Sequence, residues 1–287
     1  MLTGAAGYLG SHLQRLDNPG WAIRTWTRAD GDLSQSGAAE AAVVGMDLVI
    51  HCAARVRDGR PDDYVRDNVT ATGLLARAAR QAGASRFVYL SSIAVHRPVG
   101  VDLYADSKRE AEDVLQAVAG LSAVILRPGI LWGGPLDTRL TSSLRRGLKR
   151  RSLVLPGRCD APLPFSHVDN VADAIRLAAD LADVDATEAF DITDGGTVSL
   201  RAFAEALADW EGLPRPRLHV PAGLLIRGLS VAERIRSRLA PSVAMPVRAD
   251  TVRLVNEGMA VDLAPARARL GYAPLAREHL GPAAAGN

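Results

Sequence analysis

The stretch TGAAGYLGSHL, residues 3–13, places Gly4, Gly7 and Gly10 at the spacing G-x-x-G-x-x-G. In a turn between a strand and a helix, the first two glycines let the backbone approach a pyrophosphate, and the third lets the helix pack against the sheet. The start of such a helix also offers N–H groups to the phosphates. Three glycines in one turn are common, so an ordinary glycine-rich loop remains the alternative. With a helical pattern directly after it, the turn predicts a dinucleotide-binding site.

Strand-like and helix-like patterns alternate downstream of this turn. Four apolar runs have the length and composition of buried parallel strands: 21–26, 46–54, 85–92 and 121–129. The helical patterns between them end at Gly83 and Gly120, as helices that stop at a glycine do. This alternation predicts the α/β class, with a Rossmann-type doubly wound parallel sheet.

The regular alternation stops near residue 133, and from residue 197 onward the pattern is mostly helical. We therefore expect a dinucleotide-binding domain over residues 1–132, to which residues 166–196 return. The remaining residues, 133–165 and 197–287, are expected to form a smaller, mostly helical cap that binds the substrate.

The beginning of the chain departs from this plan. Only Met1, Leu2 and Thr3 precede Gly4, whereas strands usually have about five residues. A short central strand leaves hydrogen-bonding groups of its neighbours without partners, which is costly. Either the native chain starts upstream of Met1, which we favour, or the strand is short.

Composition narrows the range of partners. Of 287 residues, 48% are hydrophobic, and the net charge of +2 comes from interspersed signs, which argues against a nucleic-acid surface. The arginine-rich stretch 144–153 is interpreted as a solvated helix face or a cap loop. Cys52 and Cys159 match no metal-binding or redox spacing, and so few cysteines suit the cytoplasm. No apolar run reaches the roughly 20 residues of a membrane span, and no signal peptide is visible.

The end of the second predicted strand bears on the type of cofactor. An acidic side chain there would bind the ribose 2′-hydroxyl of NAD. Thr27 stands at that position and Arg28 follows, and an arginine can bind a 2′-phosphate through two hydrogen bonds. NADP is therefore predicted, with NAD as the other option, and Asp32 is expected near the adenine. The alternative is that Arg28 is one more surface arginine in an arginine-rich chain.

The segment LYADSKREAE, residues 103–112, contains one of only two lysines in the chain, the other being Lys149. Tyr104 and Lys108 are four residues apart, so on a helix both side chains lie on one face. A tyrosine hydroxyl has a pKa near 10. A nearby ammonium stabilises the phenolate and lowers that pKa. The pair therefore predicts an acid–base site, against the alternative of an exposed aromatic beside a solvated lysine.

Ser92 ends the apolar run FVYLSS, at the edge of the sheet where folds of this kind bind ligands. Its hydroxyl could bind a substrate oxygen beside Tyr104. Ser91 is the competing candidate, and a hydroxyl that merely caps the strand is the alternative.

Together these motifs resemble the extended short-chain dehydrogenase/reductase family over nearly the whole chain. The resemblance includes HCAA (51–54), NVTATG with Asn68, LRPG with Arg127, FSHVDN (165–170) and FDITDGG (190–196). It implies that Ser92, Tyr104 and Lys108 are the catalytic residues. The implied cofactor-binding residues are Gly4, Gly7, Tyr8, Leu9, Gly10, Arg28, Asp32, Leu33, Ala53, Ala54, Asn68, Tyr104, Lys108, Pro128 and Gly129. The resemblance also implies a homodimer, paired through the helices that follow NVTATG and YADSK.

Departures from the family pattern limit the chemistry. No acidic residue follows Ser92, where sugar-nucleotide dehydratases carry an acidic pair. Leu163 and Pro164 stand where sugar-nucleotide epimerases tend to have an arginine. The segment after Arg28 is too short for the usual third strand, so the sheet is expected to lose an edge strand, as in the dehydrorhamnose reductase branch.

Residues 219–255 are largely aliphatic and resemble the cap of the 3β-hydroxysteroid dehydrogenase-like branch, although plain helix core has the same composition. The resemblance implies an NAD(P)-dependent oxidoreductase that moves a hydride between nicotinamide and a hydroxyl or carbonyl carbon of a small, hydrophobic substrate. Two alternatives stay open. One is a sugar-nucleotide epimerase that retains NAD, and the other is a non-catalytic protein that senses a dinucleotide.

Overall fold

A computed structural model describes residues 1–16, 20–57, 59–134, 140–196, 198–239 and 248–275. The chain divides into two compact units. The first comprises Met1–Gly129, Val168–Ile192 and Leu263–Ala273, and the second comprises Ile130–His167, Thr193–Asp262 and Pro274–Asn287. Residues 263–273, which the sequence groups with the cap, thus belong to the first unit.

A six-stranded parallel sheet forms the centre of the first unit, as the alternating pattern predicts. Its strand order is β10-β5-β4-β3-β1-β2. The strands are β1 (Leu2–Thr3), β2 (Thr25–Trp26), β3 (Leu48–His51), β4 (Arg86–Leu90), β5 (Ala123–Pro128) and β10 (Glu188–Ile192). Phe87, Val88, Ile125 and Leu126 are fully buried or nearly so, because both faces of the sheet are covered.

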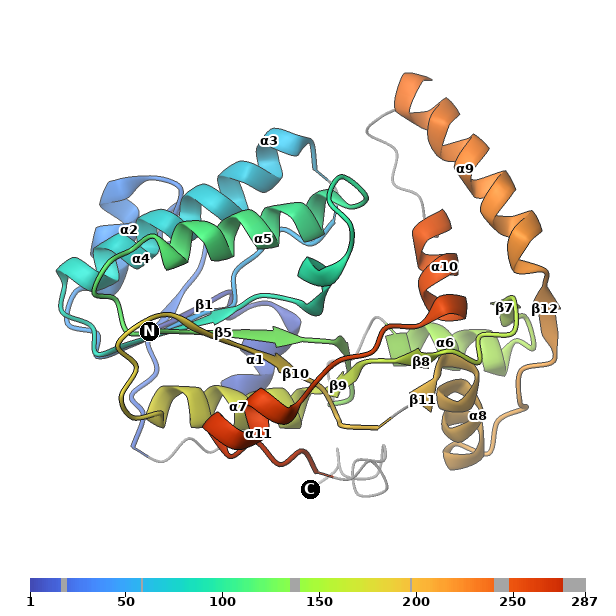
Figure 1. Cartoon of the computed structure of the whole chain (residues 1–287). Helices are drawn as coiled ribbons and strands as arrows, with labels where there is room; N and C mark the ends of the chain where they lie inside the picture. The colour runs from blue at the N-terminus through green and yellow to red at the C-terminus, as the bar shows by residue number, and fades with distance from the viewer. Residues whose placement is uncertain (17–19, 58, 135–139, 197, 240–247, 276–287) are drawn as a thin grey trace. The chain divides into compact units, whose positions relative to one another are not determined.

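Helices pack on both faces of this sheet (Figure 1). One face carries α2 (Ser36–Val43), α4 (Ala71–Gln81) and α5 (Leu103–Gln116), and the other carries α1 (Tyr8–Leu13) and α7 (Val168–Asp180). The short helix α3 (Pro61–Tyr64) and a π-helical turn, η1 (Val65–Thr70), lead into α4, and α11 (Ala264–Leu270) packs beside α7. This arrangement is the doubly wound fold that the sequence predicts.

The sheet ends at β2, which has a single neighbour, β1. No strand lies beyond β2 among the described residues, in agreement with the short segment that follows Arg28. The cofactor turn therefore lies close to the edge of the sheet rather than deep within it.

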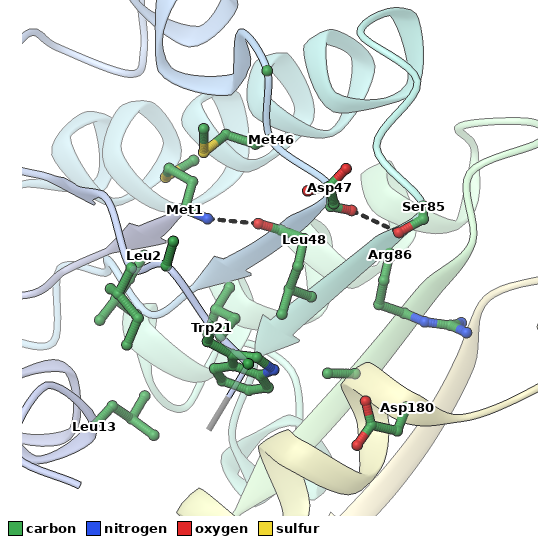
Figure 2. A pocket seen from close by; sticks show the side chains of 16 residues that line it. Met1, Leu2, Leu13, Trp21, Met46, Asp47, Leu48, Ser85, Arg86 and Asp180 are labelled. Atoms are coloured by element: carbon green, nitrogen blue, oxygen red, sulfur yellow. Dashed lines mark hydrogen bonds between the residues drawn. The ribbon is translucent and has the colours of Figure 1, made fainter. Parts of the chain in front are cut away.

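β1 is short, and a cavity opens beyond its first residue (Figure 2). The Met1 ammonium donates a hydrogen bond to Leu48 O at 2.6 Å, and burial lowers its pKa. The cavity has a volume of about 400 Å³, and Leu13, Trp21, Met46 and Arg86 are among the residues that line it. It opens at the amino ends of β3 and β4, whereas the glycine turn follows the carboxyl end of β1.

The second unit consists of short strand pairs and helices. The strand pairs are β6 (Ile130–Trp132) with β9 (Phe165–His167), β7 (Val154–Pro156) with β12 (Leu218–Val220), and β8 (Pro162–Leu163) with β11 (Val198–Ser199). The helices are α6 (Leu140–Lys149), α8 (Leu200–Trp210), α9 (Ala222–Leu239) and α10 (Ala249–Glu257). Its core includes Phe165 stacked on Phe203, with ring centroids 4.7 Å apart. In the ranges that the structure describes, no helix combines the length and apolar composition needed to cross a membrane.

Candidate active site

The glycine turn joins β1 to α1 in a conformation that other residues would not allow. Gly4 has a φ of +68°, and a Cβ at this position would lie 2.6 Å from the backbone nitrogen of Ala53. A Cβ on Gly10 would collide with the carbonyl oxygen of Gly4. Gly7 closes the turn by donating its N–H to Gly4 O at 2.8 Å. Because no side chains fill this turn, its backbone can approach the pyrophosphate of a dinucleotide.

The surroundings of the turn also suit a phosphate. The first turn of α1, which includes Tyr8 and Leu9, carries no acidic side chain that would repel one. Further along α1, His12 Nε2 lies 2.6 Å from Asp169 Oδ1 at the start of α7. This contact holds α1 against α7 and so fixes the direction in which the helix leaves the turn.

Three arginines meet at one buried carboxylate near the end of β2. Arg28 Nη2 and Arg55 Nη2 lie 2.6 and 2.7 Å from Asp67 Oδ2, and Arg66 Nε lies 2.8 Å from Asp67 Oδ1. Burial alone would raise the pKa of Asp67, but hydrogen bonds from Arg66, Arg55 and Arg28 lower it. The side chain of Arg28 remains 76% exposed, so its guanidinium can still meet an incoming anion.

The sequence analysis missed Arg55 and Asp67. Arg55 follows Ala54 directly after the carboxyl end of β3, and that position is the signal that could have identified it. Arg28 and Arg55 follow β2 and β3, which lie on either side of β1, and both guanidinium groups meet at Asp67.

The other residues that are predicted to bind the cofactor differ in how deeply they are buried. Asp32 is exposed, and its Oδ1 accepts a hydrogen bond from Ser34 N at 2.9 Å. Leu33 lies in the hydrophobic core, so only its backbone could contact a ligand. Ala53 and Ala54 are half-buried beside the glycine turn, and Ala53 N donates to Thr3 Oγ1 at 3.2 Å.

Asn68 is buried in the π-helical turn η1 and links two parts of the site. Its Oδ1 accepts a hydrogen bond from Arg55 N at 2.7 Å, and its Nδ2 donates to Ser107 Oγ at 2.8 Å. Ser107 Oγ in turn donates to Tyr104 O at 2.9 Å. The resemblance implies that Asn68 binds the cofactor, whereas its side chain here connects Arg55 with α5.

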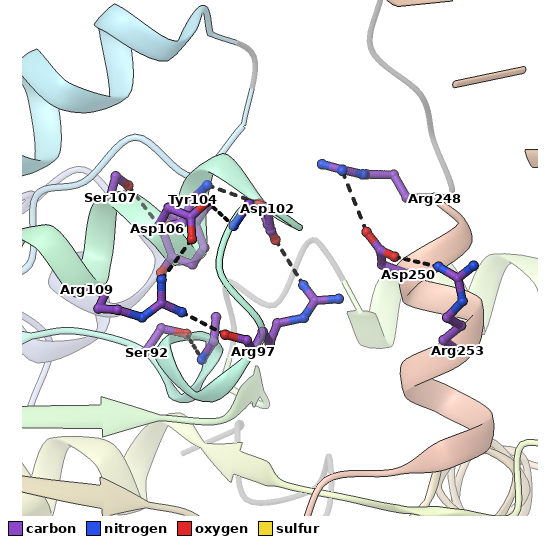
Figure 3. A network of polar contacts seen from close by, with 12 residues as sticks. Ser92, Arg97, Asp102, Tyr104, Asp106, Ser107, Arg109, Arg248, Asp250 and Arg253 are labelled. Atoms are coloured by element: carbon purple, nitrogen blue, oxygen red, sulfur yellow. Dashed lines mark hydrogen bonds and ion pairs between the residues drawn. The ribbon is translucent and has the colours of Figure 1, made fainter. Parts of the chain in front are cut away.

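Tyr104 lies in the first turn of α5, whose start is held by several ion pairs (Figure 3). Asp102 caps the helix by accepting a hydrogen bond from Tyr104 N at 3.0 Å. Arg97 pairs with Asp102 at 2.9 Å, and Arg109 pairs with Asp106 at 2.8 Å. Tyr104 is half-buried, and these contacts fix the backbone that carries it.

Lys108 lies one helical turn after Tyr104, so both side chains lie on the same face of α5. It is only 1% exposed, and its Nζ donates to Leu90 O at 2.6 Å and to Tyr89 Oη at 3.1 Å. Burial lowers the pKa of Lys108 to about 7, although the charge of Glu112 acts to raise it. The helix face that carries Tyr104 thus also carries an ammonium whose pKa is near neutrality.

The two candidate serines differ in what they contact. Ser91 is buried and donates to Glu112 Oε1 at 2.5 Å, and Glu112 also pairs with Arg127. Ser92 is half-buried, and its Oγ accepts a hydrogen bond from Ala94 N at 3.2 Å. Ser91 therefore belongs to a buried ion-pair network, whereas the hydroxyl hydrogen of Ser92 donates to no other described residue.

Pro128 and Gly129 lie at the carboxyl end of β5. Pro128 is buried and pairs with Ile192 in β10, and Gly129 N donates to Ile192 O at 3.2 Å. The first unit thus brings the predicted residues together at the carboxyl ends of β1, β4 and β5, where parallel sheets of this type bind ligands.

Comparison with known proteins places this arrangement in a family. A model of the NAD dependent epimerase/dehydratase family matches residues 1–193. A 3 beta-hydroxysteroid dehydrogenase/Delta 5-->4-isomerase of Mycobacterium tuberculosis is 28% identical over 96% of this chain and 86% of its own. A 4-hydroxy-2-methyl-3-oxo-4-farnesyl-3,4-dihydroquinoline-1-oxide ketoreductase of Stigmatella aurantiaca is 29% identical over 95% of this chain and 91% of its own.

A solved structure supports the same fold. The dTDP-4-dehydrorhamnose reductase of Bacillus anthracis, in complex with NADP, superposes with a TM-score of 0.69 at 20% identity. The match covers 78% of this chain and 84% of the reductase. The chain belongs to the NAD dependent epimerase/dehydratase family, among the extended short-chain dehydrogenases/reductases.

Proposed function

We propose that this NAD(P)-dependent oxidoreductase prefers NADP and acts on a hydroxyl or carbonyl carbon of a small apolar compound. The observation that carries the proposal is the buried Lys108 ammonium one helical turn from Tyr104. In this proposal the first unit holds the cofactor and the second recognises the substrate.

Each of the three proposed catalytic side chains has a separate task. A bound nicotinamide supplies or accepts the hydride. Tyr104 exchanges the proton with the substrate oxygen, because Lys108 favours its phenolate and brings its pKa toward neutrality. Ser92 donates a hydrogen bond to the same oxygen and orients it. Lys108 remains close enough to the strand ends to hold the ribose of the cofactor as well.

The preference for NADP is supported by the charges at the end of β2. Thr27 stands where an acidic residue would select NAD, Arg28 follows it, and Arg55 and Arg66 add positive charge around Asp67. A 2′-phosphate could accept hydrogen bonds from guanidinium groups that Asp67 already holds in position.

The apolar substrate class is supported by the relatives and by the second unit. The two relatives described above are named for a hydroxysteroid and for a farnesyl-bearing ketone. The position where epimerases tend to carry an arginine is occupied by Leu163, which is buried in the core of the second unit. A sugar diphosphate would find no cation at that position.

The Tyr104→Phe variant tests this function. It removes only the hydroxyl, so we expect the turnover of apolar ketones to fall by about 10²- to 10⁴-fold while NADPH binding stays within about threefold. The measurement is steady-state oxidation of NADPH, together with a fluorescence titration of NADPH binding. Tyr64→Phe, a change on α3, is a matched control that should keep full turnover.

Two outcomes would count against the proposal. Near-normal turnover by Tyr104→Phe would remove Tyr104 from the chemistry. A wild-type protein that interconverts a sugar nucleotide with no net change in the cofactor would instead be an epimerase.

A further inference from the structure

Tyr89 is a buried side chain to which the sequence analysis assigns no role. It lies in β4, three residues before Ser92, and it is 0% exposed. Its Oη accepts a hydrogen bond from Lys108 Nζ at 3.1 Å, and Lys108 Nζ lies 4.5 Å from the centroid of its ring. Tyr89 is therefore the one side chain among the described residues that donates or accepts a hydrogen bond with the proposed catalytic lysine.

A chain of buried polar groups continues behind Tyr89. Its ring stacks on His51, with centroids 5.6 Å apart. His51 Nε2 lies 3.0 Å from Thr72 Oγ1, and His51 Nδ1 lies 2.7 Å from Thr3 Oγ1. All these side chains are 0% exposed, so water cannot replace any of these partners.

The hydrogen-bonding capacity of Thr72 sets the direction of each bond. Its single hydroxyl hydrogen goes to Asn68 O, at 2.5 Å, so its oxygen must accept from His51 Nε2–H. The other ring nitrogen, Nδ1, then accepts from the Thr3 hydroxyl. This assignment requires a neutral His51, in accord with burial, which lowers its pKa to about 3.

The direction of the contact between Lys108 and Tyr89 follows from the ammonium. An ammonium has hydrogens to donate and no lone pair, so Tyr89 Oη must be the acceptor. A lone pair of the Tyr89 hydroxyl is therefore directed at Lys108 Nζ.

Among the described residues, no anionic side chain forms a hydrogen bond with Lys108. Burial raises the pKa of the Cys52 thiol to about 12, so this group is neutral. Glu112, on the same helix, is engaged by Ser91 and Arg127 and acts on Lys108 only through its charge, which raises the pKa of Lys108. His51 is neutral, and the pKa of Tyr89 is raised well above 10 by its burial. Both hydrogen-bond acceptors of Lys108, Leu90 O and Tyr89 Oη, are thus neutral.

We propose that Tyr89 is a positioning residue for the reaction: its hydroxyl holds the Lys108 ammonium charged and directs its third N–H toward the cofactor ribose and Tyr104. The proposal rests on the proposed function of Tyr104 and Lys108. Two of the three ammonium hydrogens are engaged by Leu90 O and Tyr89 Oη in the described structure, which leaves one for the site.

The small number of lysines permits a direct test in the cofactor-free protein. With lysine labelled by ¹³C at the ε carbon, the Lys149→Arg background contains one lysine, Lys108, and gives one side-chain resonance to titrate by NMR. The wild-type midpoint is expected near pH 7. In Tyr89→Phe the ammonium loses an acceptor inside the protein, so we expect the midpoint to fall by about one unit.

A matched control and a second variant keep this test decisive. Tyr272→Phe removes another buried tyrosine hydroxyl, remote from Lys108 in the sequence, and should leave the midpoint unchanged. If Tyr89→Phe does not fold, Tyr89→Met removes the same hydroxyl with a flexible side chain that can fill the space of the ring. A fall at least as large is then expected, because the ring that faces the ammonium is lost as well. A midpoint that stays within about 0.2 units in the folded variant overturns the proposal.

The kinetic consequence distinguishes this proposal from the proposed function. Carbonyl reduction needs Lys108 in its charged form, so activity should decline above the midpoint, and Tyr89→Phe should move that decline to lower pH by the same amount. We expect kcat to fall about tenfold with little change in KM for the ketone. An unmoved pH profile overturns the role of Tyr89 even if Tyr104 proves essential. Normal turnover by Tyr104→Phe overturns the proposed function, whatever the NMR titration of Lys108 shows.

Discussion

Arg28 is the residue whose charge bears most directly on the choice of cofactor. Its exposed guanidinium is held 2.6 Å from Asp67, close to the end of β2. Arg28→Ala should weaken NADPH binding by about tenfold or more, because hydrogen bonds between charged groups contribute about 1.5–3 kcal/mol. NADH carries no 2′-phosphate, so its affinity should stay within about twofold. Separate fluorescence titrations with the two cofactors measure both effects.

A suitable control is Arg215→Ala, which removes another exposed arginine that is paired with an aspartate, Asp209, in the second unit. Both affinities should then stay at the wild-type level. An equal loss of NADPH and NADH affinity in Arg28→Ala would mean that Arg28 supports the fold of the site rather than contacting the 2′-phosphate.

His51 should make the protein sensitive to acid. Burial lowers its pKa from 6.5 to about 3, so the folded state keeps it neutral while the unfolded state binds a proton. The stability that depends on a neutral His51 is fully present above pH 6.5. As the pH falls from 6.5 toward 3, the free energy of unfolding decreases by up to roughly 1.4 kcal/mol per pH unit. Urea unfolding at a series of pH values should show this slope, and His51→Gln should reduce it.

The exposed His219 on β12 provides the comparison for that experiment. His219→Gln should keep the wild-type slope. If His51→Gln loses stability with acid as steeply as the wild type, other groups are responsible for the acid sensitivity.

At the scale of elements, β1 and β2 are the shortest strands of the six-stranded sheet. β1 contributes two residues between β2 and β3, and the cavity of about 400 Å³ opens where a longer strand would continue. The buried Met1 ammonium lies at this point and donates to Leu48 O (Figure 2). A charged group buried beside apolar side chains costs stability, as the lowered pKa of this amine indicates.

An N-terminal extension by Met-Val-Val should therefore stabilise the protein. The added backbone would continue β1, the valines would bury apolar surface in the cavity, and the ammonium would move into solvent. We expect the free energy of unfolding to rise by about 1–3 kcal/mol, measured by urea denaturation. An extension of the same length, Met-Gly-Asp, should bring no gain. If both extensions behave alike, the cavity does not accept a strand.

Helix α5, which carries Tyr104, is held in place by contacts with several neighbouring elements. Asp102 caps its start, Ser107 connects it to Asn68 on η1, and Lys108 connects it to β4. The backbone that carries Tyr104 is therefore held on three sides. Catalytic geometry of this kind depends on supporting contacts that keep the reacting side chain in place.

At the scale of the whole molecule, the two units differ in structure and in amino-acid composition. The first unit contains the parallel sheet and all the residues proposed for the cofactor and for catalysis. The second contains the aliphatic helices, in which Leu224, Val231 and Ile235 of α9 are each at least half exposed. In the function that we propose, substrate specificity can change in the second unit without disturbing the chemistry in the first.

Local patterns in the sequence were sufficient for much of this description. Glycine spacing in residues 4–10 predicted the cofactor turn, since only glycine allows its backbone conformation and close approach. The four apolar runs predicted β2, β3, β4 and β5, and the i, i+4 spacing of Tyr104 and Lys108 placed both on one helix face. The short segment after Arg28 predicted the missing edge strand. These features depend on residues that are close together in the chain.

Contacts between distant segments could not be read in the same way. The meeting of Arg28 and Arg55 at Asp67, the difference between Ser91 and Ser92, and the network from Thr3 through His51 to Tyr89 each join residues on separate elements. Tyr89 lies within an apolar run, where its ring looks like ordinary core. Its hydroxyl acquires the role that we propose only because folding brings Lys108 to it from α5, and burial then excludes the water that would otherwise replace this partner.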